Sequence, residues 1–150
     1  MYSGALINCK FILSLFLVCI VSGCASGLNS IQKAEYSSFE SSGVLIEEKD
    51  PKLAIALGIL PGVGSFYVEE VGPGIINLLL WPVSILWDPF SGYEGAISIN
   101  YQVTKWTINK KKEKELSALA DKLALDEIDI KSYIIAKNEV IQKYDYTQLP

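Results

Sequence analysis

The chain has 150 residues, half of them hydrophobic, with 13 basic side chains against 17 acidic ones. All the basic residues are lysines, so the chain contains neither arginine nor histidine. Without histidine there is no Ser-His-Asp or Cys-His catalytic system and no imidazole metal ligand. The net charge of −4 argues against a nucleic-acid-binding protein, which normally carries a basic face.

Residues 1–23 have the pattern of a secretory signal peptide. Lys10 is the only charged residue before Lys33, and a largely apolar run of about eleven residues, 11–21, follows it. That run is too short for a membrane-spanning helix, which needs about 20 residues. An uncleaved membrane anchor remains the alternative.

The apolar run ends in Val21-Ser22-Gly23-Cys24, which resembles the lipobox of bacterial lipoproteins. This resemblance implies cleavage before Cys24 and covalent diacylglyceryl and N-acyl lipids on that residue. No other cofactor is expected. Ala25, where an aspartate would retain such proteins in the inner membrane, implies an outer-membrane lipoprotein that faces the periplasm.

Residues 24–49 read as the lipidated cysteine followed by a serine-rich tether. Six serines lie between residues 25 and 43, and such a composition buries too little apolar surface to fold alone. Tyr36 and Phe39 could dock on another surface, but the composition favours a solvated linker. Asp50 and Pro51 then have the pattern of a helix N-cap and first helical residue.

Residues 50–93 contain two uncharged runs, 53–68 and 71–87, which only Glu69-Glu70 separates. The pattern predicts a hydrophobic hairpin of two helices, each of about 8–14 residues, with a tight connection around residues 69–74. Sixteen helical residues measure roughly 24 Å, which is less than the bilayer core of about 30 Å. The residues that we expect to allow close helix packing are Gly58, Pro61, Gly62, Gly64 and Gly74.

The stretch Leu60-Pro61-Gly62-Val63-Gly64-Ser65-Phe66-Tyr67 and the later run from Leu78 to Pro89 resemble small two-transmembrane-helix (TM-two) families, in an uncharacterised branch found in lipoproteins. The resemblance carries no established chemistry. If the hairpin enters a membrane, the aromatic residues expected at the interface are Tyr67, Trp81, Trp87 and Tyr93. The alternative is a soluble core, which accommodates the Glu69-Glu70 pair more easily.

Residues 94–150 predict an amphipathic helical tail. A long helix over 94–125 lacks internal proline, and a break at Asp126-Glu127 precedes a second, shorter helix. From about residue 115 the tail has Leu116-x-x-Leu119, a turn, and then Ile128, Tyr133 and Lys137 at matching spacings, which resembles the short C-terminal oligomerisation domain (SHOCT). Asp129 replaces the usual threonine N-cap, Ser132 replaces a glutamate, and the usual turn glycine is missing.

The SHOCT resemblance implies a helical hairpin that self-associates or docks on a partner. An ordinary pair of amphipathic helices is the alternative. The residues that we expect to mediate association are Leu116, Leu119, Leu123, Ile128, Tyr133, Ile134, Lys137 and Ile141.

Catalytic and metal sites are not expected. Adjacent acidic residues point about 100° apart on a helix and form no facing pair, and Ser65 has no histidine to activate it. The sequence therefore predicts a mainly α, non-enzymatic protein with membrane lipids and its own copies, or an envelope protein, as partners. Our first hypothesis is a membrane-embedded structural lipoprotein that self-associates. The alternative is a periplasm-facing adaptor of an envelope complex, in which the hairpin is a protein core.

Overall fold

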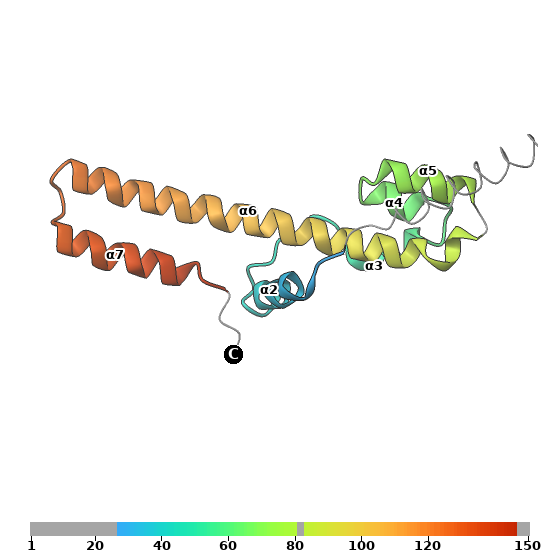
Figure 1. Cartoon of the computed structure of the whole chain (residues 1–150), viewed down its shortest axis with the longest axis horizontal. Coiled ribbons are helices and arrows are strands. Elements are labelled where there is room, and N and C mark those ends of the chain that lie inside the picture. The colour runs from blue at the N-terminus through green and yellow to red at the C-terminus, as the bar shows by residue number, and fades with distance from the viewer. Residues whose placement is uncertain (1–26, 81–82, 147–150) are drawn as a thin grey trace, which may run out of the picture. The chain divides into compact units, whose positions relative to one another are not determined.

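The computed structural model describes residues 27–80 and 83–146 (Figure 1). These residues form helices and turns without any strand, which confirms the mainly α class. The chain divides into two compact units. Unit 1 comprises Gly27 and the described residues of Lys49–Ile97, and unit 2 comprises Leu28–Glu48 and the described residues from Ser98 onward.

Unit 1 contains α3 (Pro51–Leu57), α4 (Val63–Tyr67), α5 (Val71–Leu79), the 3₁₀ helix η1 (Ser84–Leu86) and the first turns of α6 (Asp88–Ala124). The Asp50 side chain accepts hydrogen bonds from the backbone N–H groups of Lys52 and Leu53, at 2.8 and 3.2 Å, which confirms the predicted N-cap. The expectation of two helices is wrong, because α3 and α4 divide the first apolar run.

The division occurs at Pro61-Gly62, where the chain turns back. Gly62 has a φ of +74°, which favours glycine, and a Cβ atom there would lie 2.4 Å from the Gly74 carbonyl oxygen. α4 therefore returns beside α3. The Tyr67 hydroxyl at the end of α4 accepts a hydrogen bond of 2.9 Å from the Asp50 backbone N–H at the start of α3.

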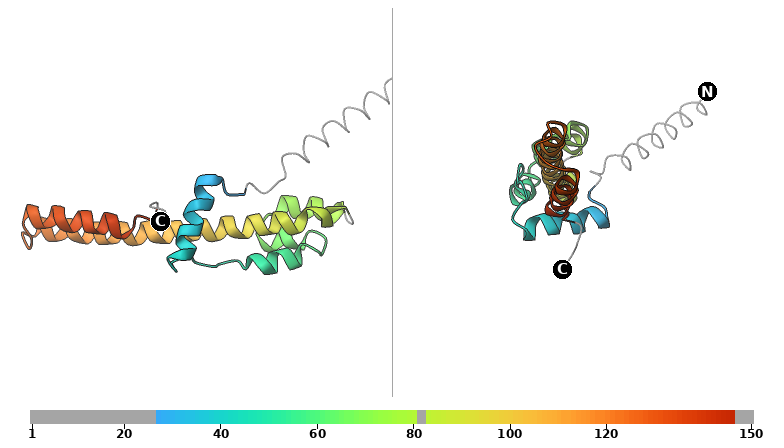
Figure 2. Two further views of the ribbon diagram at one scale, coloured as in Figure 1. Left: turned by 90° about the horizontal axis from the view of Figure 1, so that it is seen from below. Right: turned by 90° about the vertical axis from the view of Figure 1, so that its left-hand side faces the viewer.

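Unit 2 begins with α2 (Ser30–Ser41), in the segment predicted to be a flexible tether. That prediction is wrong for this segment for two physical reasons. Asn29 and Gln32 form a reciprocal capping box that satisfies the first N–H groups of α2. Phe39 is buried and stacks on Tyr101 of α6, with ring centroids 6.0 Å apart, so α2 docks on α6 (Figure 2).

The long helix of the tail is present as α6, which begins six residues before the expected start at Glu94. The buried positions in its first half pair polar side chains such as Asn100 and Thr104 with apolar ones such as Ile97 and Tyr101. A leucine stripe begins only at Leu116.

The chain then reverses, and α7 (Ile130–Lys143) runs back alongside α6 (Figures 1 and 2). Asp126 has a φ of +55° and takes the place of the missing turn glycine. The Glu127 N–H donates to the Lys122 carbonyl at 2.9 Å, which closes a Schellman motif. Asp129 caps α7 as predicted, and its side chain accepts a 3.0 Å hydrogen bond from the Ser132 N–H.

Candidate functional site

The interior of unit 1 holds a cluster of polar side chains that we call the Asp88 cluster: Ser65, Asn77 and Asp88, with Trp87 at its edge. The Ser65 hydroxyl donates to Asp88 Oδ1 at 2.5 Å, and the Asn77 amide donates to the same oxygen at 2.6 Å. The Trp87 indole N–H donates to Asn77 Oδ1 at 2.8 Å. The cluster ties α4, α5 and the start of α6 together inside the unit.

Further oxygen atoms inside unit 1 are buried without a hydrogen-bond partner among the described residues. They belong to Asp88 (Oδ2), Ser84 (Oγ) and Glu70 (Oε2). Burial, and then the negative charge of Asp88, raise the pKa of Glu70 above its ordinary value. Because Ser65 is fully buried and its hydroxyl donates a hydrogen bond to the Asp88 carboxylate, the cluster holds helices together and does not present Ser65 as a nucleophile at the surface.

A second polar group lies where α3 begins and α4 ends. The Lys49 ammonium group lies 2.9 Å from a Glu69 carboxylate oxygen and 5.3 Å from the centre of the Tyr67 ring. Glu69 has a φ of +66°, and the Glu70 N–H donates to the Ser65 carbonyl at 2.9 Å, so α4 ends in a Schellman motif. The Glu69-Glu70 pair was expected at the hairpin tip. Glu69 instead lies beside Lys49, which precedes α3.

The packing residues predicted in the hairpin lie at close helix contacts. A Cβ atom on Gly58 would lie 2.4 Å from the Cα atom of Pro89, and one on Gly64 would lie 2.8 Å from the Cα atom of Gly58. Gly74 packs against the ring of Phe66. Pro61 lies in the turn between α3 and α4.

The described aromatic residues predicted at the interface lie in different parts of unit 1. Tyr67 lies at the end of α4 near Lys49, whereas Trp87 lies beside the Asp88 cluster. Tyr93 is exposed. It follows Gly92, where a Cβ atom would lie 3.1 Å from the Ala54 carbonyl oxygen. Trp81 lies outside the described residues, as do the lipobox residues Val21, Ser22, Gly23 and Cys24.

Unit 2 contains a closed hydrogen-bonded triangle of Glu35, Tyr101 and Lys105. The Tyr101 hydroxyl and the Lys105 ammonium group donate to the same Glu35 oxygen at 2.6 and 2.8 Å, and Lys105 also donates to Tyr101 at 2.8 Å. Burial by itself raises the pKa of Glu35, but the hydrogen bonds from Lys105 and Tyr101 outweigh it and lower that pKa. Burial and the bond to Glu35 raise the pKa of Tyr101. The triangle fixes α2 to α6.

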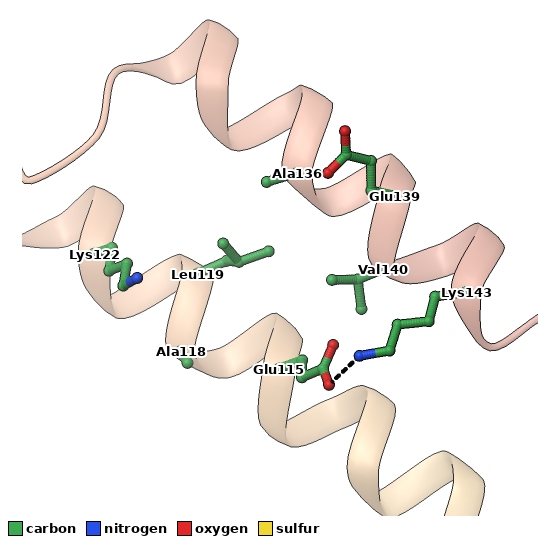
Figure 3. A pocket seen from close by; sticks show the side chains of 8 residues that line it. All are labelled: Glu115, Ala118, Leu119, Lys122, Ala136, Glu139, Val140 and Lys143. Atoms are coloured by element: carbon green, nitrogen blue, oxygen red, sulfur yellow. Dashed lines mark hydrogen bonds and ion pairs between the residues drawn. The ribbon is translucent and has the colours of Figure 1, made fainter.

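The hairpin of α6 and α7 encloses a shallow groove (Figure 3). Leu119 points from α6 toward Ala136 and Val140 of α7, and the Lys143 ammonium group lies 2.7 Å from Glu115 at the groove's end. No residue of α7 is fully buried.

The residues predicted to mediate association occupy two faces of this hairpin. The half-buried ones are Leu116, Leu119, Leu123, Ile128 and Tyr133. Ile134 and Ile141 are exposed. The Lys137 ammonium group is also exposed, and it lies 5.9 Å from the Tyr133 ring centre.

Sequence reasoning missed the Asp88 cluster. Ser65 was considered only as a nucleophile, and Asn77 and Asp88 were not singled out. A signal was present, because Asn77 is an amide within an otherwise apolar stretch and Asp88 is the first charged residue after it. A polar side chain in such a stretch needs a buried hydrogen-bonding partner.

In residues 27–80 and 83–146, no helix combines the length and hydropathy needed to cross a bilayer. The same residues contain no group of three or more histidine, cysteine or acidic side chains placed to hold a metal ion. No protein family, no curated protein and no solved structure matches this chain. The lipobox, TM-two and SHOCT resemblances therefore stay predictions.

Proposed function

We propose that the protein is a structural lipoprotein of the bacterial envelope, anchored by lipids on Cys24 in the outer membrane and facing the periplasm, that acts without catalysis through self-association. The observation that carries this proposal is the exposed apolar face of α7. Ile130, Ile134 and Ile141 are all exposed, and residues at these spacings share one side of a helix.

This face, which we call the isoleucine stripe, continues the apolar contact between α6 and α7. Tyr133, Ala136 and Val140 face α6, and the isoleucine stripe lies about 100° around the helix from them. Two helices alone cannot bury an apolar surface this wide, whereas two such hairpins could bury it against each other as a four-helix bundle. In such a bundle the isoleucine stripe of one copy packs against the isoleucine stripe of the other, because a two-fold interface uses the same surface of both copies.

In the alternative adaptor hypothesis, the hydrophobic hairpin of residues 53–87 is a protein core. Among the described residues of that segment, the buried apolar side chains are Ala54 and Val68, while Ser65, Asn77 and Ser84 are also buried. No observation therefore favours that alternative.

Self-association is tested by co-purifying two differently tagged copies of the lipoprotein from detergent-solubilised membranes. The test variant is Ile130→Ser with Ile134→Ser, and the matched control is Ile135→Ser. Ile134 and Ile135 are 52% and 51% exposed, but Ile135 points about 100° away from Ile134.

Burial of one isoleucine is worth about 1.5–3 kcal/mol, so the double variant should lose at least about tenfold in co-purification. The control should co-purify like the unaltered chain. Equal co-purification of all three proteins would refute self-association through α7. Lipid attachment is tested separately by the intact mass of the mature protein. A Cys24→Ala variant fused to a cleavable secretory signal should be lighter by about the mass of the acyl groups.

A further inference from the structure

Unit 1 has polar side chains inside and apolar ones outside. Its largest fully buried side chains are Asp88, Ser65 and Ser84. Its exposed apolar side chains include Leu60, Leu79, Val83, Leu86 and Phe90. Proteins in water bury most such side chains, and exposed apolar side chains that gather on one surface mark a contact with something apolar.

The charged residues of unit 1 gather near the end where α3 begins. Because α4 returns beside α3, Glu69 lies next to Lys49, and Asp50 and Lys52 follow in the same turn. α6 leaves unit 1 at this end, since Gly95 packs against Val68 at the end of α4. The Glu69 carboxylate therefore lies at the polar end of unit 1, so inserting the other end into an apolar medium does not bury this charge.

The opposite end of unit 1 is apolar. Gly58 at the end of α3 packs on Pro89, so Ile59 and Leu60 lie near the start of α6. The chain reaches that point through the described residues 78–80 and 83–87, which carry no charge. Of the described side chains at this end, Asp88 is the charged one, and it is fully buried and hydrogen-bonded.

The size of unit 1 matches one leaflet. α3 has 7 residues and α5 has 9, which correspond to lengths of roughly 10 and 14 Å. Half of a bilayer core measures about 15 Å.

We propose that unit 1 inserts its apolar end into the acyl chains of one leaflet and keeps the end with Lys49 and Glu69 at the headgroups, so that the chain enters and leaves on the same side. This inference rests on the proposed membrane location but not on self-association. In lipid, apolar contact between helices gives little driving force, and hydrogen bonds such as those of the Asp88 cluster hold the elements together. They also satisfy polar groups that no water can reach there.

The first experiment uses the full mature chain with Cys24→Ala, which removes the acyl chains. The protein is floated with unilamellar vesicles of phosphatidylethanolamine and phosphatidylglycerol. It should float with the vesicles, and Leu86→Asp should weaken binding roughly 60–300-fold, because an aspartate costs about 2.5–3.5 kcal/mol near the centre of the membrane.

The matched control is Ile31→Asp in unit 2. Ile31 and Leu86 are both 80% exposed, so the two changes add the same charge at equally accessible positions. Ile31→Asp should bind like the parent. Failure of the parent to float, or equal loss in both variants, would overturn the proposal, and circular dichroism checks that all three proteins keep their helices.

The second experiment separates insertion into one leaflet from crossing. Two single-cysteine variants, Lys52→Cys and Leu60→Cys, are made in the Cys24→Ala background and bound to vesicles. A membrane-impermeant maleimide should label Lys52→Cys from outside and should label Leu60→Cys neither from outside nor from the vesicle lumen. Labelling of Leu60→Cys from the lumen would show crossing, and labelling from outside would show that the apolar end stays in water.

These outcomes are distinct from those of the proposed function. If unit 1 does not insert, the lipoprotein can still be anchored by Cys24 and co-purify with its own copies. If co-purification fails, vesicle binding of the unlipidated chain is unaffected, because the isoleucine stripe lies in unit 2.

Discussion

Unit 1 and unit 2 both bury polar side chains, but among the described residues only unit 2 also buries aromatic rings. In unit 2 the buried ring of Phe39 stacks on Tyr101, and Asn100, Thr104 and Ile108 are buried further along α6. In unit 1 the centre is the Asp88 cluster, and large apolar side chains lie on the outside. The difference agrees with the proposed insertion of unit 1 into one leaflet.

The largest effect is expected from Phe39→Ala in unit 2. Phe39 is 2% exposed, and removing a buried aromatic ring typically costs about 3–5 kcal/mol in the free energy of unfolding. Urea unfolding followed by circular dichroism measures this loss. The control Ile31→Ala, on the same helix but exposed, should change the free energy by less than about 0.5 kcal/mol. Similar losses in both variants would show that α2 does not form part of an apolar core.

In unit 1 the corresponding change is Asp88→Ala, which leaves the buried donors of Ser65 and Asn77 without their acceptor. We expect a loss of about 2–4 kcal/mol in the free energy of unfolding, measured in detergent micelles. Asp88→Asn keeps an oxygen in the same place and should cost less than about 1 kcal/mol. If both variants lose the same amount, the hydrogen bonds do not hold unit 1 together.

Glu35→Gln tests the polar contact between α2 and α6. The ion pair with Lys105 is partly exposed, so we expect a loss of only about 1 kcal/mol near neutral pH. The pKa of Glu35 is lowered in the folded state, so its stabilisation is complete above the ordinary value of 4.5 and is lost as the pH falls below it.

The difference in unfolding free energy between Glu35→Gln and the unaltered chain should therefore shrink on acidification. Glu40→Gln, an exposed change on the same helix, is the control and should show no such trend. A difference that is independent of pH would mean that the triangle does not stabilise unit 2.

The smallest effect compares two acidic residues with positive φ, one in each unit. Asp126→Gly relieves a left-handed backbone and should stabilise unit 2 by about 0.5 kcal/mol. Glu69→Gly relieves a similar backbone in unit 1 but also removes the partner of Lys49, so its gain should be smaller. Thermal unfolding of the two variants measures both changes, and a larger gain from Glu69→Gly would contradict this order.

Several elements could be predicted from local sequence because their causes lie within a few residues. Asp50 with Pro51 and Asp129 before α7 are the predicted caps, since a cap depends on a side chain and the next two or three N–H groups. The break at residues 126–127 could also be predicted, because it depends on neighbouring residues of the chain. α2 was not predicted, because a serine-rich composition indicates a linker, whereas the helix start is set by the capping box of Asn29 and Gln32.

The sequence by itself determined that the chain is helical, where its charges lie, and that residues 53–87 carry no charge apart from Glu69 and Glu70. The tertiary structure decided which helix ends lie next to each other in unit 1. The turn at Pro61-Gly62 returns α4 to the start of α3, which brings Glu69 to Lys49 and leaves the other end of unit 1 without an exposed charge among its described residues. The tertiary structure also brings Ser65, Asn77 and Asp88 together. These contacts join residues 11 to 23 positions apart, and no local pattern encodes the path of the chain between them.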